Sequence, residues 1–428
     1  MNMINVRRLA VMTFLGAGML SDISAQDFSL QADTLNEARL PAQWDLQSCI
    51  DYALEQNITI RKNRVTAEST QIDVKTAKAA LFPSLSFSTS QQVVNRPYQE
   101  TSSRVSGSEI ISSNSKTSYN GNYGLNASWT IYNGSKRLKT LKQERLNNQV
   151  AELDVATSEN MIKESIAQIY IQILYAAESV RVNENTLQVS IAQRDRGQEL
   201  LNAGSIAKSD FAQLEAQVST DRYQLVTAQA TLQDYKLQLK QLLELDGENE
   251  MNVYLPKLSD ENVLAPLPAK KDVYVSALAI RPEIEASKLN VEASELGIDI
   301  AKSSYFPTIS LSAGIGTNHT SGSDFTFGEQ VKNGWNNSIG LSVSVPIFNN
   351  RQTKSAVQKA KLQRETDMLS LLDEQKALYK TIESLWLDAN SAQQRYAAAN
   401  EKLRSTQISY DLISEQFDLG MKNTVELL

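Results

Sequence analysis

Hydrophobic residues follow two different periods along this chain. In a few short segments apolar and small polar residues alternate, which places every second side chain on the same face of a β-strand. In long segments apolar residues recur in alternating steps of three and four, which keeps one side of a helix apolar. The pattern therefore predicts a few strands joined to long helices.

Four alternating segments are predicted as strands, at about 83–94, 119–132, 307–318 and 335–348, and none contains Asp, Glu, Lys or Arg. Each has the length of about ten residues that a tilted transmembrane strand requires. A soluble sheet would also alternate, but the absence of charge in all four favours a sheet with one face in lipid. The apolar positions are Tyr119, Tyr123, Leu125, Ala127, Trp129 and Ile131 in the second segment and Ile339, Leu341, Val343, Val345 and Ile347 in the fourth.

A Phe-Pro pair stands before the first strand of each pair, in "AALFPSLSFSTS" and in "SSYFPTISLSAG". Proline tolerates the first position of a strand and biases the residue before it to extended geometry. We therefore predict that Pro83 and Pro307 mark the points where a helix ends and a membrane strand begins.

Two long segments, 214–242 and 378–403, carry heptad repeats, which predict left-handed coiled-coil packing. The segment 135–203 lacks proline and has few glycines, so it is predicted as one helix of roughly 100 Å. Heptads identify packing and not purpose, so a fibrous stalk stays an alternative for the helices alone. The repeat positions are Leu378, Ile382, Leu385, Ala389, Ala392, Tyr396, Ala399 and Leu403 in one segment and Leu214, Val218, Leu225, Ala228, Leu232, Tyr235, Leu239 and Leu242 in the other, with Asp221 as the polar exception.

Two separate stretches of the first half recur in the second half at one offset. "YGLNASWTIYNGSKR" (123–137) aligns with "IGLSVSVPIFNNRQT" (339–353), and 339 − 123 = 216. "ELLNAGSIAKSDF" (199–211) aligns with "EQFDLGMKNTVEL" (415–427), and 415 − 199 = 216. Two matches at one offset predict two copies of one unit.

The duplicated unit predicts the domain boundaries. The first copy covers 26–245 and the second 272–428, and the stretch 246–271, with its prolines and mixed charge, is predicted as a linker. In each copy a long helix turns at a hairpin tip, at about 203–210 and about 418–425. The helix that returns over about 211–245 has no counterpart before Leu428, so we expect the second copy to be truncated by roughly 30 residues.

The N-terminus has the features of a secretory signal. Arg7 and Arg8 precede an apolar run that ends at Leu20, and "SDISAQ" predicts cleavage after Ala25, so residues 1–25 would be removed. The mature net charge is then (42 − 2) − (49 − 1) = −8, because two arginines and Asp22 are lost. An acidic chain argues against a nucleic-acid partner.

Residues for metal or histidine chemistry are scarce, so no cofactor or metal is expected. The single cysteine, Cys49, is predicted to pack on the apolar face of "LQSCIDYAL", and the single histidine, His319, is placed in a polar loop. "SIAK" at 205–208 fits the Ser-x-x-Lys of serine acylases, but the Lys-Thr-Gly element of that class is absent. The sequence therefore gives no support to an enzyme.

Four strands cannot close a barrel. An open edge in lipid leaves backbone groups unpaired at several kcal/mol each, so the chain is expected to oligomerise. Three copies give twelve strands, whereas two give eight, which is too narrow for a duct. The sequence prefers a homotrimer without excluding other numbers.

With its duplicated halves, its Phe-Pro breaks and the turns "NAGSIAKSDF" and "DLGMKNTVEL", the chain resembles the outer-membrane factor family, the TolC-like exit ducts of efflux pumps and type I secretion. The resemblance implies a mainly α protein with membrane β-strands: a trimeric twelve-stranded barrel in the outer membrane of a Gram-negative-type cell, continuous with a periplasmic helical tunnel. It also implies passive conduction, with a periplasmic adaptor and an inner-membrane transporter as partners. A soluble periplasmic coiled-coil protein is the alternative.

The resemblance also implies a constriction at the two hairpin tips. Ser209 and Asp210 on the first hairpin would face Lys422 on the second. Phe417 stands where a tyrosine often contributes a hydroxyl, and Glu426 matches an acidic position that forms a ring. Three symmetric carboxylates in a narrow neck would attract cations. The alternative is that Asp210 only caps a helix and Glu426 is a solvated surface charge.

The same tips are expected to contact the adaptor. Gly204, Ser205, Gly420 and Met421 are the residues predicted for that surface. The two glycines are expected to take left-handed backbone geometry at the end of each long helix. A plain turn without a partner is the alternative.

Overall fold

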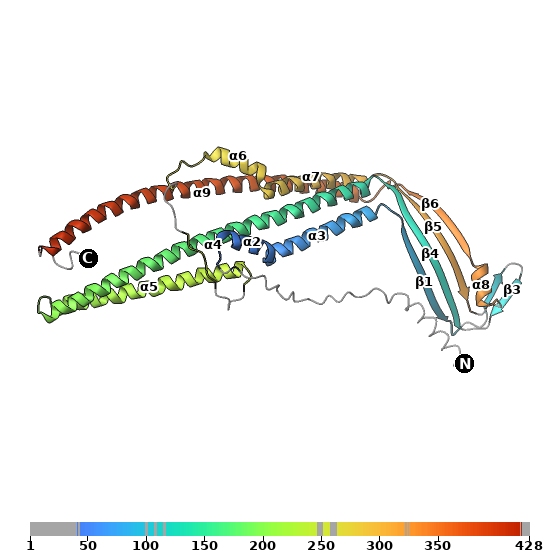
Figure 1. The fold of residues 1–428 in the computed structure, drawn as a ribbon. Helices are drawn as coiled ribbons and strands as arrows, with labels where there is room; N and C mark the ends of the chain where they lie inside the picture. The colour runs from blue at the N-terminus through green and yellow to red at the C-terminus, as the bar shows by residue number, and fades with distance from the viewer. Residues whose placement is uncertain are drawn as a thin grey trace.

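The computed structural model describes residues 41, 43–98, 102–106, 109–113, 117–245, 251–256, 263–321, 323, 325–419 and 421. The chain is elongated, with a β-sheet at one end and the turn between two long helices at the other (Figure 1). The elements are α2 (Leu46–Gln56), α3 (Ile58–Ala79), β1 (Ser84–Asn95), β2 (Ser102–Ser106), β3 (Glu109–Ser113), β4 (Thr117–Asn133), α4 (Lys136–Asn202), α5 (Lys208–Leu242), α6 (Lys270–Ile280), α7 (Pro282–Ser303), β5 (Thr308–Thr320), α8 (Phe327–Asn333), β6 (Asn336–Ser344) and α9 (Gln352–Asp418).

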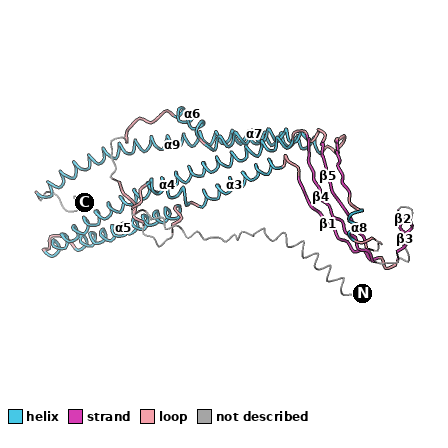
Figure 2. Tube along the Cα trace, turned by 45° about the vertical axis from the view of Figure 1, so that its right-hand side comes forward, coloured by secondary structure: helices cyan, strands magenta, loops and turns pink. Residues whose placement is uncertain are grey.

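The main sheet is antiparallel throughout and has the order β1-β4-β5-β6 (Figure 2). Each half of the sequence supplies two adjacent strands, and β4 pairs with β5 across the halves. The register aligns Phe87 with Leu125 and Leu125 with Ile315, so the apolar positions of neighbouring strands share one face. The strands β1 and β6 are the two edges of this sheet.

The end of β4 contains a bulge that the alternation did not predict. Thr130 pairs with Ser310, and the next residue in register is Tyr132, opposite Ile309. Ile131 is the extra residue, so Tyr132 takes the place that the pattern assigned to Ile131. A bulge bends the strand and interrupts the ladder, which is common where a sheet ends.

The predicted strand at 335–348 ends earlier, at Ser344. Pro346 has no backbone N–H to donate to a ladder, which explains why pairing stops two residues before it. The connections between the strands of each pair also contain structure: β2 and β3 form a hairpin between β1 and β4, and α8 lies between β5 and β6. His319 lies within β5, opposite Gly121, and not in a loop as predicted.

The heptad seam of α5 packs against α4 as an antiparallel hairpin. Every predicted seam position of α5 is buried or half-buried, with Val218 and Leu239 most fully enclosed. Asp221 is also buried, with 4% of its surface exposed, and its Oδ1 accepts a hydrogen bond of 2.9 Å from Gln217 Nε2. The helix begins at Lys208 and not near 211, because Asp210 accepts a hydrogen bond from the N–H of Ala207.

The heptad seam of α9 is covered within the chain only along its first part. There α6 lies against α9, with the ring centroids of Tyr274 and Tyr379 5.4 Å apart, and Leu378 is buried. From 397 to 412 every residue is exposed, although this stretch includes the seam positions Ala399 and Leu403 and the apolar residues Ile408 and Leu412. The stretch 397–412 therefore has no covering partner among the described residues of the same chain.

A hydrophobic core lies where α2 and the end of α5 meet the middle of α4. Cys49 is fully buried there, as predicted, and burial raises the pKa of its thiol to about 12. The core residues are Trp44, Cys49, Ala53, Ile166, Tyr170, Ile173, Leu239, Leu243, Met251 and Val253. The last two belong to the stretch predicted as a linker, so part of that stretch is built into the core.

Asn57 joins three helices at this core. Its Oδ1 accepts from the N–H groups of Thr59 and Ile60 and caps the start of α3, while its Nδ2 donates to the carbonyl of Leu242 at the end of α5, at 3.0 Å. One buried amide thus satisfies backbone groups at two helix ends, which would otherwise be unpaired.

The later part of the predicted linker is fixed to α9. Trp386 Nε1 donates to the carbonyl of Pro268 at 3.1 Å, and Gln393 Nε2 donates to that of Ala265 at 2.8 Å. Lys270, at the start of α6, forms an ion pair of 3.3 Å with Glu383. The stretch from 263 to 270 therefore lies along α9, with α6 following it.

The turn from strand to long helix has the same backbone in both halves. Gly134 and Ser135 have φ of 67° and 64°, and Asn350 and Arg351 have φ of 50° and 66°. These pairs are also separated by 350 − 134 = 216 residues. Two consecutive left-handed residues are rare for non-glycine side chains, so the sequence repeat has a counterpart in backbone conformation.

Among the described residues, none of the helices is both long and apolar enough to cross a membrane.

We predict that Gly134→Ala destabilises the protein more than Gly204→Ala. Both glycines have positive φ, which costs a side chain about 1–2 kcal/mol. A Cβ at Gly134 would also lie 2.6 Å from the carbonyl oxygen of Ser303, whereas a Cβ at Gly204 has no atom within 4 Å. Circular dichroism at a fixed heating rate in one detergent measures both midpoints. Equal shifts would show that the close approach at Gly134 does not matter.

Candidate functional site

One face of the main sheet is lined by small uncharged polar side chains. The described strands of this sheet contain no Asp, Glu, Lys or Arg. Ser84 Oγ and Ser128 Oγ lie 2.8 Å apart, Asn126 Nδ2 donates to Ser88 Oγ at 3.3 Å, and Ser342 Oγ donates to the Ser310 carbonyl at 3.4 Å. Hydroxyl and amide groups of this kind can line a water-filled space without adding a fixed charge.

The opposite face of the sheet exposes large apolar side chains. Leu341, for example, has 63% of its surface exposed, although it is paired with Leu311. A sheet face with several large, exposed apolar side chains is unusual in contact with water and marks a membrane or protein contact. The most exposed large apolar side chains of this face in the described strands are Leu85, Phe87, Val93, Ile339 and Leu341.

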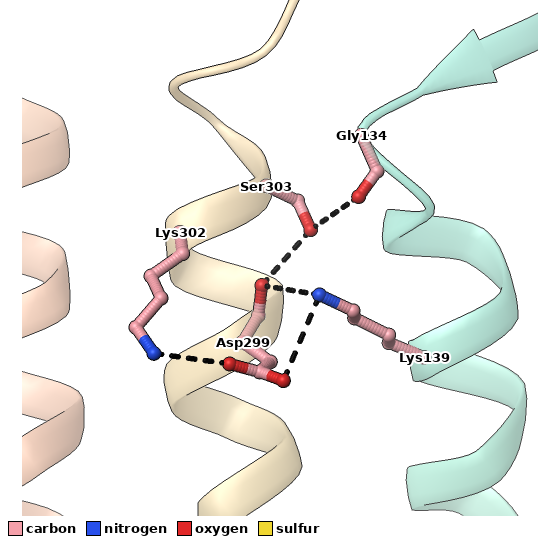
Figure 3. Close-up of polar contacts among 5 residues, drawn as sticks. All are labelled: Gly134, Lys139, Asp299, Lys302 and Ser303. Atoms are coloured by element: carbon pink, nitrogen blue, oxygen red, sulfur yellow. Dashed lines mark hydrogen bonds and ion pairs between the residues drawn. The ribbon is translucent and has the colours of Figure 1, made fainter.

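The helices join the sheet through a buried hydrogen-bond cluster (Figure 3). Ser303, at the end of α7, has 2% of its surface exposed, and its Oγ donates at 2.8 Å to the carbonyl of Gly134, which precedes α4. The same hydroxyl contacts the carbonyl of Asp299 within its own helix at 2.9 Å. Close packing of these turns explains why only glycine fits at 134.

Asp299 links the two helices beside this cluster. Its Oδ1 accepts from Lys302 Nζ at 3.2 Å, and Oδ2 lies 3.7 Å from Lys139 Nζ on α4 (Figure 3). The hydrogen bond from Lys302, with the charge of Lys139, lowers the pKa of Asp299 below its usual value. Because the folded-state pKa is lowered, this stabilisation is present at neutral pH and is lost as the pH falls through it. The carboxyl is exposed, so solvent screening keeps the contribution small.

Two side chains fasten the β1 side of the junction: Arg137, which the sequence reasoning did not single out, and Trp129, which it named only as an apolar strand position. Arg137, in the first turn of α4, donates to the carbonyl of Thr130 at the bulge and to that of Phe82. Trp129 Nε1 donates to the carbonyl of Leu81 at 2.9 Å. The repeated "FP" and the repeat that covers 123–137 were the sequence signals near these groups. Pro83 and Pro307 stand immediately before β1 and β5.

The tip of the first hairpin is described in full. Gly204 has the predicted left-handed geometry, and the N–H of Ser205 donates to the carbonyl of Leu200 at 2.8 Å. Ser209 Oγ donates to Asp210 Oδ1 at 3.2 Å, and Asp210 Oδ2 accepts from the Ala207 N–H at 3.4 Å. Asp210 therefore does cap the start of α5, and both side chains are exposed.

The second tip is described only in part. Phe417 lies in the last turn of α9, and Met421 is exposed. Gly420, Lys422 and Glu426 lie outside the described residues. The predicted contact of Ser209 and Asp210 with Lys422 therefore stays a prediction. Within the described part of the chain, no group of three or more His, Cys, Asp and Glu side chains is placed to hold a metal ion.

A sequence profile described as "Outer membrane efflux protein" matches residues 49–244 and 273–428, which is most of the chain. The chain belongs to the outer membrane efflux protein family. Membership places it in the outer membrane with an extension into the periplasm, and the gap between the two matched segments falls at the predicted linker.

Two curated family members show how far the sequence similarity reaches. The outer membrane efflux protein BepC of Brucella suis is 25% identical over 272 residues, which cover 63% of this chain and 56% of BepC. The outer membrane protein TolC of Escherichia coli is 24% identical over 318 residues, which cover 71% of this chain and 62% of TolC. The matches thus span less than two thirds of the length of these relatives.

The fold is that of solved outer-membrane proteins of this family. The crystal structure of the outer membrane protein VceC of Vibrio cholerae superposes with a TM-score of 0.73 at 16% identity. The alignment covers 89% of this chain and 88% of VceC. At this identity the similarity establishes the architecture alone.

We predict that Ser303→Ala destabilises the protein by about 1–3 kcal/mol, because it leaves the buried carbonyl of Gly134 without its donor. The matched control is Ser304→Ala, since the neighbouring serine is exposed. Thermal unfolding of both variants in the same detergent compares them. A similar loss in the two variants would show that the Ser303 hydrogen bond does not stabilise the junction.

Proposed function

We propose that three copies of this chain form the outer-membrane exit duct of a tripartite efflux pump or type I secretion system. The observation that carries the proposal is the main sheet, with one uncharged hydroxyl-lined face, one exposed apolar face and two open edges. A sheet of this kind fits a barrel wall with water on one side and lipid on the other. The long helices then continue the duct into the periplasm.

The edges β1 and β6 support closure of the sheet by pairing between chains. In lipid each unpaired backbone group costs several kcal/mol, so β6 of one chain pairs with β1 of the next. Three chains with four strands each give a twelve-stranded barrel, wide enough for a water-filled duct. Two chains would give a barrel whose interior side chains fill the space.

The exposed stretch of α9 supports the same assembly. The apolar residues Leu403, Ile408 and Leu412 project from 397–412, and no described segment of the chain covers them. In a trimer the adjacent helices of a neighbouring chain lie beside this surface. Coiled-coil packing between chains would bury the seam that the chain alone leaves open.

The duct itself stores no energy in this mechanism. An adaptor binds the tips at Gly204, Ser205, Gly420 and Met421, and its binding energy favours an open arrangement of the helices. The inner coiled coils untwist and separate Ser209 and Asp210 from Lys422, with Phe417 beside them. An inner-membrane transporter supplies the work, and the transported compound passes along the hydroxyl-lined wall.

The barrel predicts a sharp difference between two neighbouring positions of β6. Leu341→Lys places a charge on the lipid face and costs about 2–4 kcal/mol near the midplane, whereas Ser342→Lys places it in the water-filled lumen. The measurement is the mass of the particle extracted from outer membranes, by light scattering corrected for detergent. We expect three chains per particle for the wild type and for Ser342→Lys, and a large loss of this particle for Leu341→Lys.

Normal assembly of Leu341→Lys would contradict the barrel. A wild-type protein recovered from the soluble fraction as a monomer or dimer would instead favour a periplasmic coiled-coil protein.

We also propose that Glu426 forms a ring of three carboxylates in the neck of the duct. Such a ring attracts cations and repels anions, so Glu426→Gln should reduce cation selectivity. The measurement is the reversal potential of single channels in planar bilayers under a salt gradient. Glu426→Asp keeps the charge and serves as the control. An unchanged reversal potential in Glu426→Gln would show that Glu426 does not face the conduction path.

A further inference from the structure

The short helix α8 lies over one definite face of the sheet. Phe327 of α8 contacts Tyr123 of β4, with ring centroids 6.5 Å apart, and His319 of β5, with centroids 5.1 Å apart. Tyr123 is two residues from Leu125, and no bulge separates them in the register. Because side chains alternate along a strand, Tyr123 and Leu125 point to the same side. The helix therefore covers the apolar face and not the hydroxyl-lined face.

Several contacts hold α8 against β5. Thr317 Oγ1 donates to the carbonyl of Val331 at 2.7 Å, and the N–H of Thr320 donates to Gln330 Oε1 at 2.8 Å. Thr326 and Glu329 cap the helix start reciprocally, with the Thr326 N–H 2.8 Å from Glu329 Oε2. The bonds from Thr317 and Thr320 attach the helix to the sheet, at the end distant from the long helices (Figures 1 and 2).

The level of α8 matches the outer boundary of an apolar band. Thr317 lies opposite Tyr123, and Ile309 lies opposite Tyr132 near the helix-side end of the sheet. They are 317 − 309 = 8 residues apart, which at about 3.3 Å per residue and a tilt of about 40° is roughly 20 Å along the barrel axis. The apolar band of a transmembrane barrel is about 25 Å tall. The contacts of α8 therefore begin in the outermost part of a band that starts at Ile309, about 5 Å below its limit.

The surface that α8 and its flanks present is amphipathic. Phe325, Phe327 and Trp335 are 52%, 45% and 57% exposed, and Glu329 and Lys332 are exposed on the same short segment. Aromatic side chains next to charged ones are typical of the membrane–water interface, where one part of a side chain meets acyl chains and another meets headgroups.

We propose that α8 lies in the headgroup layer of the outer leaflet, on the lipid side of the barrel, with its exposed aromatic side chains in contact with lipid. The inference rests on the proposed function, because it needs the apolar face of the sheet to face lipid. The partner is the bilayer itself, because α8 lies on the apolar face of the sheet, which is the face proposed to contact lipid. A helix that plugs the lumen would have to lie over the opposite, hydroxyl-lined face.

Site-directed spin labelling tests this placement. The variant Gly328→Cys is suited to the label, because a Cβ at Gly328 has no atom within 4 Å. The controls are Leu341→Cys on the apolar face and Ser342→Cys on the hydroxyl-lined face. Cys49 is fully buried, so it leaves little background labelling. Lys332→Cys, on the same exposed side of α8, is the second variant if Gly328→Cys does not assemble.

The measurement is the collision rate of each label with oxygen and with a water-soluble nickel complex, in trimers reconstituted into phosphatidylcholine–phosphatidylglycerol vesicles. The ratio of oxygen to nickel collisions rises with depth in the bilayer. We expect the highest ratio at Leu341→Cys, the lowest at Ser342→Cys and an intermediate value at Gly328→Cys and Lys332→Cys. A ratio on α8 equal to that of Ser342→Cys, with Leu341→Cys still high, would overturn the placement of α8 and leave the duct intact. Low ratios at all positions would overturn both proposals.

Discussion

Backbone groups at the edge of a sheet must find partners, and in lipid no water can supply them. In the main sheet only the two central strands, β4 and β5, have a neighbouring strand on both sides. The edge strands β1 and β6 each leave one row of backbone N–H and C=O groups without a partner strand. The proposed assembly follows from this requirement. Chains placed edge to edge around an axis also bring their helices side by side, which gives the exposed stretch of α9 a partner.

The junction between sheet and helices has to reconcile two different spacings. Each strand of the sheet is continuous with one helix: α3 leads into β1, β4 into α4, α7 into β5 and β6 into α9. Neighbouring strands lie about 4.8 Å apart, whereas packed helices lie 8–10 Å apart. The chain must therefore spread within a few residues. Left-handed turns, a bulge, and the bonds of Ser303 and Arg137 to backbone carbonyls occur together at this place.

Several features of the site were predictable because they depend on local periods. Alternation identified the apolar face of the sheet, and the heptads identified the α5 seam that packs on α4. The left-handed geometry of Gly204 was predictable from a glycine at the end of a long helical segment. The register slip at Ile131 and the helix α8 were not predictable in this way. The alternation continues through Ile131, and the seven residues of α8 are too few for a helical period to emerge.

The sequence by itself determined the four strands of the main sheet, the apolar face of each and the long helices, because each of these follows from residues a few positions apart. Comparison of the two halves at an offset of 216 residues determined the duplication. Only the tertiary structure decided how distant parts complete one another. Asn57 reaches a carbonyl 185 residues away, Ser303 reaches one 169 residues away, and Met251 and Val253 leave an apparent linker to join the core. Such contacts depend on which surfaces meet after folding. A period along the chain carries no information about which two surfaces pack together.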